Sequence, residues 1–183
     1  DPTIKILVFD SEGLPVDNTE KLNYEAYEAL VGGRLDVTGK DKNGRWMVDG
    51  INFHLYPNRL DYSRDHVIFT STYMVRQATK QVNELIEKAN KKHGRTGEKR
   101  LMWGLTEINV NAGNPNREVA GSGCPSFLGG QFIAEIYGIG MEHGALTVAP
   151  WCISETDRVR TDFGYLGLPT EFYPRSSYYH TQM

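Results

Sequence analysis

The segment Leu101–Val110, which reads LMWGLTEINV, decides the fold class of this chain. It is short, apolar and rich in β-branched and aromatic residues, which is typical of a buried strand. Three further segments have the same character, namely Ile4–Phe9, Val48–Tyr56 and Ala145–Trp151. Their starts are separated by roughly 45 to 50 residues, which is enough for a strand, a helix and two loops in each interval.

Helical patterns fill these intervals. Apolar residues recur at helical spacing over residues 22–30, and an unbroken apolar stripe runs over residues 75–89 until Gly94 ends it. An apolar segment over residues 127–141 contains four glycines, which indicate close packing on a neighbour, and a last helix is expected near Pro174. Apolar strands that alternate with helices predict an α/β fold in which helices cover a parallel sheet.

Polar residues follow every predicted strand, and in parallel α/β folds chemistry collects at the carboxyl ends of the strands. Four strand ends of this kind favour a (β/α) barrel of the TIM type over an open sheet. The polar, glycine-containing segment Asp36–Arg45 predicts an exposed connection or a small hairpin.

Composition excludes several classes of protein. The 183 residues suit a single domain, and 20 basic against 23 acidic residues leave no positive excess, so nucleic acid is not expected as a partner. The longest apolar run, Ile4–Phe9, is far short of the ~20 residues that cross a bilayer, so no membrane span is expected. Cys124 and Cys152 lack any metal or redox spacing, and one disulfide between them remains open. No motif for a cofactor or a metal is found.

Glu107 lies at the end of a predicted buried strand, where a carboxylate must be hydrogen-bonded, paired or neutralised. One interpretation is structural, with the carboxylate capping a helix or pairing with an arginine such as Arg100. The other is functional, because His54 and Tyr56 alternate on the preceding strand and face the same way. A tyrosine hydroxyl beside a carboxylate can hold it ionised and oriented. Taken singly, His54 is better explained as a core histidine and Tyr56 as an aromatic that packs at the rim.

Two more strand ends could contribute to a site. Trp151 ends the last predicted strand, and an indole face there is either ordinary core or a surface on which a sugar ring stacks. Trp103 has the same strand parity as Glu107 and is expected in the barrel core. Hydrolysis of a glycosidic bond usually needs two carboxyl groups, and Glu12 and Glu155 are the candidate partners of Glu107.

In their order along the chain, the motifs DPTIKIL (residues 1–7), HLY (54–56), LTEIN (105–109) and APW (149–151) resemble the C-terminal half of a clan A glycoside hydrolase. The nearest group is family-39-like or family-5-like, and the resemblance covers nearly the whole chain. It implies a TIM barrel of which residues 1–183 supply strands five to eight as one domain.

The resemblance also implies roles for single residues. Glu107 would be the catalytic nucleophile that forms a glycosyl-enzyme intermediate, and Tyr56 would donate a hydrogen bond to it. His54 would line the sugar subsite and Trp151 would form its floor. Asn109, two residues beyond the nucleophile, is a further candidate for substrate contact. Glu12 maps to the fifth strand of the family and is expected to bind substrate. Neither a cofactor nor a metal is implied.

The sequence departs from the family pattern at the general acid/base, which in clan A is the Glu of an Asn-Glu pair ending the fourth strand. The Asn83-Glu84 pair falls inside the predicted helix over 75–89. We therefore expect the acid/base and the N-terminal barrel half to lie outside this chain. That half, or another chain, would be needed as a partner to cover the open sheet edges.

These observations predict a retaining glycoside hydrolase of a poly- or oligosaccharide, with this chain carrying the nucleophile half and inactive alone. A carbohydrate substrate of this kind implies an extracellular or periplasmic enzyme. The alternative from another class is a non-catalytic sugar-binding or structural barrel fragment, in which Glu107 and Tyr56 serve packing and recognition. A third interpretation is a complete small α/β protein with an open sheet.

Overall fold

The computed structural model describes residues 4–9, 21–57, 63–110, 122–154, 163–167 and 172–182. Two of the candidate carboxylates, Glu12 and Glu155, lie outside these residues.

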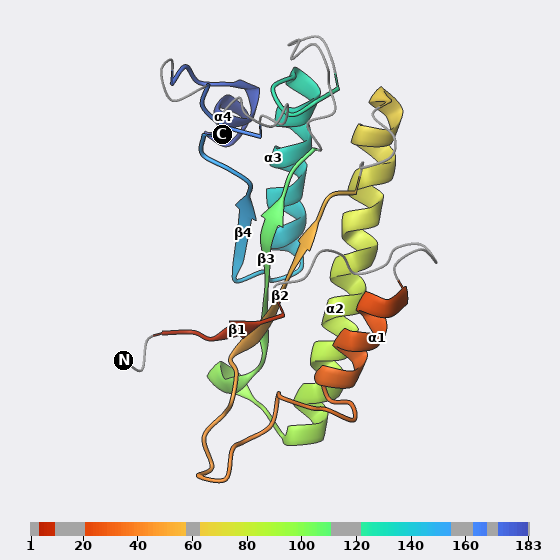
Figure 1. Ribbon diagram of the computed structural model, residues 1–183, viewed down its shortest axis with the longest axis vertical. Coiled ribbons are helices and arrows are strands. Elements are labelled where there is room, and N and C mark those ends of the chain that lie inside the picture. Colours follow the sequence, from red (N-terminus) through yellow and green to blue (C-terminus); the bar gives the residue numbers. More distant parts are fainter. Residues whose placement is uncertain are drawn as a thin grey trace.

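Within the described residues, four strands form one parallel sheet in the order β1-β2-β3-β4 (Figure 1). The strands are β1 (Leu7–Val8), β2 (Gly50–Leu55), β3 (Met102–Ile108) and β4 (Thr147–Pro150). Each strand lies inside one of the four segments that the sequence predicts. The α/β class and the parallel sheet are therefore confirmed, and each strand pairs with the next one along the chain.

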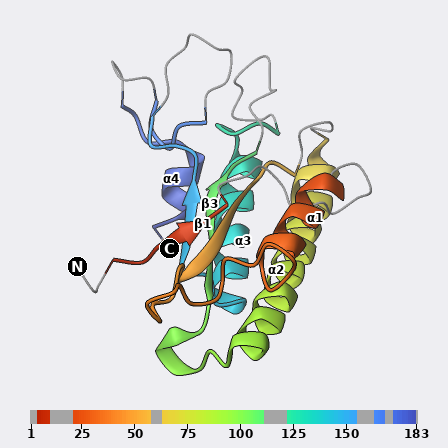
Figure 2. The same cartoon turned by 60° about the horizontal axis from the view of Figure 1, so that its bottom comes forward.

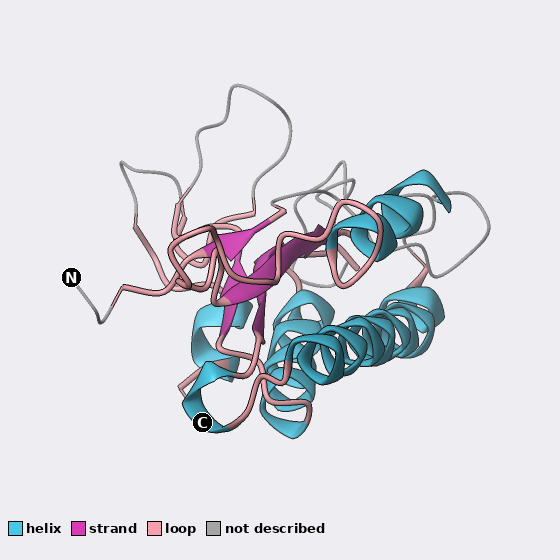
Figure 3. Cartoon of the chain, turned by 90° about the horizontal axis from the view of Figure 1, so that it is seen from below, coloured by secondary structure: helices cyan, strands magenta, loops and turns pink. Residues whose placement is uncertain are grey.

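Helices occupy the intervals that the sequence assigns to them. They are α1 (Lys21–Leu30), α2 (Ser71–His93), α3 (Phe127–Glu142) and α4 (Ser176–His180). A π-helical turn, η1 (His66–Thr70), leads into α2, and a 3-10 turn, η2 (Gly97–Lys99), precedes β3. Figure 3 shows the two longest helices, α2 and α3, side by side along one face of the sheet.

The helix ends follow ordinary capping chemistry. Gly94 adopts the left-handed conformation (φ 64°) that ends α2, and its N–H donates to Asn90 O. Ser126 begins α3 by accepting a hydrogen bond on Oγ from the N–H of Gly129, at 3.0 Å. The sequence thus indicates where α2 ends and where α3 begins.

The glycines of α3 pack closely, with one exception. A methyl group on Gly130 would meet the side chains of Ser176 and His180 in α4, and one on Gly140 would meet Val148 in β4. Around Gly138 there is open space. The prediction of close packing is therefore wrong for that residue, which lies on the outer side of the helix.

The hydrophobic core fills the space between the sheet and the long helices. Every second residue of β2, namely Ile51, Phe53 and Leu55, points into it. In β3, Trp103 stacks on Phe53 with ring centroids 5.9 Å apart, and its indole N–H donates to His143 O at 3.0 Å. Trp103 is thus a core residue on the helix side of the sheet.

A β-bulge at Thr106 changes which way the end of β3 faces. Phe53 of β2 lies opposite Leu105, but the next residue, His54, lies opposite Glu107, so β3 has one extra residue. The pairing with β4 shows the same irregularity between Leu105 and Ile108. The prediction that the side chains of Trp103 and Glu107 face the same way is therefore wrong, because a bulge reverses the alternation of side chains beyond it. Ile108 takes the next core position, and Glu107 is released to the other face.

Candidate functional site

The carboxyl ends of β2 and β3 bring Glu107, His54 and Tyr56 together. The Tyr56 hydroxyl donates to Oε1 of Glu107. His54 lies on the other side, with Nδ1 3.2 Å from Oε2. Both carboxylate oxygens thus have a partner, and His54 is a donor in the tautomer that carries its proton on Nδ1. The alternation of His54 and Tyr56 on one strand face, predicted from the sequence, is confirmed.

The alternative ion pair between Glu107 and Arg100 does not form. Arg100 bonds the carboxylate of Glu87 on α2, and both side chains are about half exposed. Glu107 is instead about three-quarters buried, with 23 % of its side chain exposed. Tyr56 and His54, rather than an arginine, thus hold the carboxylate in place.

A pocket of about 430 Å³ opens at Glu107, on the sheet face opposite α2 and α3. Its walls combine polar groups from β2 and β3 with apolar side chains from β1 and the end of β4. The lining residues are Leu7, Phe9, Asn52, His54, Thr106, Glu107 and Trp151. Trp151 is 45 % exposed, so a large part of its indole face is open to a ligand. One apolar platform and several hydrogen-bonding groups are the mixture that a sugar ring requires.

The rim of the pocket at β1 is held by a tyrosine of α1. Phe9 has a positive φ of 80°, a conformation that costs energy for a residue with a side chain. The buried hydroxyl of Tyr27 lies 2.8 Å from Phe9 O and 2.9 Å from Asn52 O. The ring of Tyr27 also packs edge-to-face on Phe9, at 5.6 Å between centroids. This helix therefore stabilises two pocket residues at once.

Asn109 does not line the pocket. It is 1 % exposed, and its amide bonds the carbonyls of Trp151 and Phe163, the latter at 3.1 Å. Its carbonyl oxygen accepts from the N–H of Val110 at 2.7 Å and from the thiol of Cys124 at 3.0 Å. The predicted substrate contact of Asn109 is replaced by contacts within the protein, because the residue lies beneath the site.

Trp151 leaves β4 toward the pocket. Its N–H donates to Ile108 O at 3.0 Å, and the peptide bond to Cys152 is cis. Cys152 and Cys124 are both free thiols. The disulfide that the sequence left open is thus not formed.

Sequence reasoning missed four of the lining residues: Leu7, Phe9, Asn52 and Thr106. Asn52 precedes His54 by two residues, so strand parity alone would have placed it on the same face. Thr106 could not be found in this way, since it is the extra residue of the bulge. Of the lining residues within the described part of the chain, Glu107 is the one carboxylate. The same part of the chain gathers no group of three or more metal-binding side chains.

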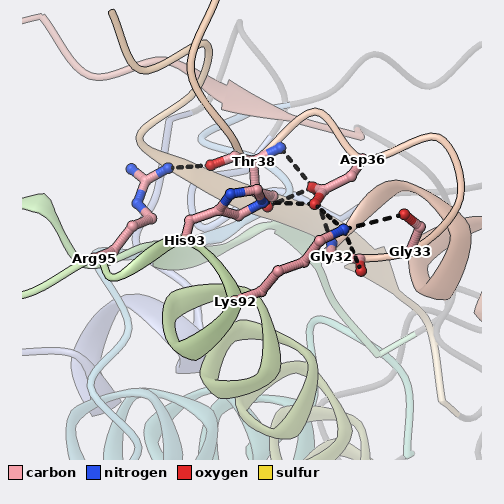
Figure 4. A network of polar contacts seen from close by, with 7 residues as sticks. All are labelled: Gly32, Gly33, Asp36, Thr38, Lys92, His93 and Arg95. Carbon is pink, nitrogen blue, oxygen red and sulfur yellow. Dashed lines mark hydrogen bonds and ion pairs between the residues drawn. The ribbon is translucent and has the colours of Figure 1, made fainter. Parts of the chain in front are cut away.

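A second polar cluster, drawn in Figure 4, joins the segment that precedes β2 to the last turn of α2. The carboxylate of Asp36, 10 % exposed, accepts from His93 Nε2 at 2.6 Å and from Lys92 Nζ at 2.9 Å. Thr38 donates to it twice, through its N–H at 2.9 Å and its hydroxyl at 2.6 Å. Burial alone would raise the pKa of Asp36, but these hydrogen bonds outweigh it and hold that pKa well below its usual range.

This cluster serves the fold. A Lys40–Trp46 bridge confirms the small hairpin predicted over residues 36–45, although Thr38 and Gly39 are buried rather than exposed. Beside the hairpin, the buried Arg95 guanidinium donates to Thr38 O at 2.7 Å and to Val48 O at 3.0 Å. The end of α2 is thereby fastened to the segment that leads into β2.

Fold and site together define an α/β protein with a parallel sheet (Figure 2) and, at the carboxyl ends of its strands, a carboxylate pocket. No family model matches the sequence, and no curated protein is significantly similar to it. In the described residues, no helix is both long enough and apolar enough to span a bilayer.

Proposed function

We propose that the chain is the nucleophile-bearing part of a retaining glycoside hydrolase that acts on a poly- or oligosaccharide. The observation that carries the proposal is the Glu107 carboxylate, held between the Tyr56 hydroxyl and His54 Nδ1 at the wall of a pocket with an exposed indole. Donors on both oxygens orient the carboxylate for attack.

In this mechanism the Glu107 carboxylate attacks the anomeric carbon of a sugar that stacks on Trp151. A bond forms between a carboxylate oxygen and that carbon, and the bond from the carbon to the leaving oxygen breaks. The leaving oxygen takes a proton from a second carboxyl group. Water, which gives one proton back to that second group, then attacks the anomeric carbon, and the bond from this carbon to Glu107 breaks and restores the carboxylate. His54, Asn52 and Thr106 supply hydrogen-bonding groups to the sugar hydroxyls.

The second carboxyl group is assigned to residues outside the described ones, since Glu107 is the one acidic side chain among the described lining residues. We further propose that the sheet is part of a (β/α) barrel. In its support, β2 turns its larger apolar side chains toward α2 and α3, while the pocket lies on the opposite face, as at a barrel interior. Further strands would then pair with the open edges of β1 and β4. A polysaccharide substrate would place the enzyme outside the cytoplasm.

The test is covalent trapping with a panel of dinitrophenyl fluoroglycosides, in which fluorine replaces the hydroxyl next to the anomeric carbon. Dinitrophenolate leaves without a proton, so labelling depends on the nucleophile and not on the missing acid. We expect one equivalent of sugar on Glu107, located by mass spectrometry of the digested protein. Glu107→Gln should take no label.

Glu87→Gln is the matched control, because Glu87 is an exposed carboxylate paired with Arg100, and it should label like the wild type. Label on another residue, with Glu107→Gln still reactive, would contradict the assignment.

A non-catalytic sugar-binding site is the second candidate, favoured by the single carboxylate among the described lining residues. It predicts a different result in the same panel. No protein would be labelled by any glycoside, while the parent sugar would still quench the fluorescence of Trp151 relative to a Trp151→Phe variant.

A further inference from the structure

We infer that Asn109 is a positioning residue for the site, tying the Trp151 platform and the donor to Glu107 to one buried amide. The inference rests on the proposed function for its effect on reaction rate, and on geometry alone for its effect on the pocket.

The hydrogen-bonding capacity of the Asn109 side chain is fully used. Its NH₂ group donates to the carbonyls of Trp151 and Phe163, and its oxygen accepts from the Val110 N–H and the Cys124 thiol. An amide has two protons and two lone pairs, so all four are engaged. Because the residue is 1 % exposed, none of these contacts can be replaced by bulk water.

One of the two carbonyls belongs to Trp151, whose indole lines the pocket. Trp151 has its N–H on Ile108 O, at 3.0 Å, and its carbonyl on the Asn109 amide, so both of its backbone polar groups are fastened to the end of β3 and the residue that follows it. The indole that lines the pocket projects from this fixed backbone. Loss of the amide would release one of the two attachments and change the angle of the indole.

The other carbonyl belongs to Phe163, which is connected to Glu107 through Tyr56. The Phe163 ring packs against Tyr56 with centroids 5.6 Å apart and an interplanar angle of 58°. Tyr56 in turn donates to Glu107. The Asn109 amide therefore holds the backbone of the residue that backs the nucleophile's hydrogen-bond donor.

Cys124 holds the amide in this orientation. Its thiol is 1 % exposed and lies 3.0 Å from Asn109 Oδ1. A side-chain amide turned by half a rotation would present its oxygen to the two carbonyls, and a donor on Oδ1 opposes that turn. Cys124 directly precedes the Pro125–Ser126 entry into α3, so the amide is also fixed relative to that helix.

The experiment compares Asn109→Ala with Asn83→Ala, whose amide bonds a backbone carbonyl, Thr79 O at 3.0 Å, on α2. The first readout is the indole ¹⁵N–¹H spectrum of the full chain, with the Trp151 signal identified by its loss in Trp151→Phe. The second is the rate constant for labelling by the dinitrophenyl fluoroglycosides, measured separately from the half-saturating concentration.

Asn109→Ala should move the Trp151 signal and leave those of Trp46 and Trp103 in place. Its labelling rate constant should fall by up to about a hundredfold, since a displacement of reacting groups by about 1 Å has that effect. Asn83→Ala should change neither. Cys124→Ala should move the Trp151 signal in the same direction and by less.

Each other result overturns a defined part. An Asn109→Ala protein that folds, keeps the Trp151 signal and labels at the wild-type rate would refute the positioning role and leave the proposed function standing. A wild type that no glycoside labels would refute the proposed function, while the indole spectrum would still show whether Asn109 positions Trp151.

If Asn109→Ala does not fold, the positioning role is tested on the wild-type protein by amide proton exchange. The side-chain amide protons of Asn109 should then exchange with solvent at least about tenfold more slowly than those of Asn83. Equal exchange rates, or a direct shift of the Asn109 amide signal on adding the parent sugar, would overturn the inference.

Discussion

Replacing Asp36 by asparagine is expected to destabilise the fold by about 2 to 3 kcal/mol at neutral pH. Asparagine keeps an oxygen in the place of Oδ1, where the N–H groups of Gly32 and Thr38 donate at 3.0 and 2.9 Å. At the Oδ2 position, however, an uncharged NH₂ group replaces the carboxylate oxygen that pairs with His93 Nε2 and Lys92 Nζ, and the Lys92 ammonium has no lone pair to accept from it. The substitution thus removes two charge-assisted hydrogen bonds.

The size of the effect follows from burial. A hydrogen bond to a charged group contributes about 1.5 to 3 kcal/mol. His93 has 23 % of its side chain exposed and bears most of the loss, whereas Lys92 is 45 % exposed and turns to water at little cost. For a chain of this length each kcal/mol lowers the melting temperature by about 2 to 4 °C, so the variant should melt about 4 to 12 °C lower.

The assay is thermal unfolding of both proteins from about pH 7 down to about pH 2. The Asp36 pKa is depressed in the folded state, and the unfolded carboxyl titrates near its ordinary value of 3.8. The stabilisation is therefore present above about pH 4 and is lost as the pH falls toward the folded-state pKa. The melting temperatures of wild type and Asp36→Asn should converge in acid.

Asp41→Asn is the control from the same hairpin. Its carboxylate bonds the solvent-exposed Arg45 side chain, and such pairs contribute little. It should melt close to the wild type. Equal melting of Asp36→Asn and wild type at neutral pH, or a gap that persists undiminished to about pH 2, would refute the reasoning.

Two further predictions concern the site and α3. Tyr56→Phe removes the donor to Glu107 and should slow fluoroglycoside labelling about 10- to 100-fold, which is the equivalent of one charge-assisted hydrogen bond. The melting temperature should change little. An unchanged labelling rate would show that the hydrogen bond has no role. Gly130→Ala forces a methyl group against α4 and should destabilise the fold by about 1 to 3 kcal/mol. Gly138→Ala places its methyl group in open space and should stabilise the fold by up to about 1 kcal/mol. Urea unfolding measures both variants, and equal stabilities would contradict the packing described for α3.

The elements of this fold can be predicted from the sequence because each is encoded locally. The stripe over residues 75–89 has helical period and ends at a glycine, and the structure has α2 there with Gly94 as its cap. The four apolar runs are too short for helices of that kind, and all four contain strands. The grouping of His54 and Tyr56 with Glu107 follows from strand alternation and from the convergence of parallel strand ends.

What the sequence could not predict depends on contacts between distant residues. Asn109 reads as a polar residue at a strand end, and only its burial beside the carbonyls of Trp151 and Phe163 distinguishes a scaffold amide from a ligand-binding one. The face that Trp103 shares with Leu105 rather than with Glu107 follows from the pairing of β3 with both of its neighbours. Alternation assumes an unbroken period of two, and no residue of the segment marks where that period fails.

The extra residue in β3 gives the pocket two adjacent wall residues, Thr106 and Glu107, from one strand. Upstream of Thr106 the odd-numbered side chains face the helices, and beyond it the phase is inverted, so Glu107 reaches the pocket and Ile108 the core. Loss of the Thr106 codon would restore the uniform period and would still leave Glu107 opposite His54 at the pocket wall and Ile108 in the core. The deletion would therefore remove one hydrogen-bonding group from the pocket wall and shorten the strand by one residue, without turning the carboxylate away from the pocket.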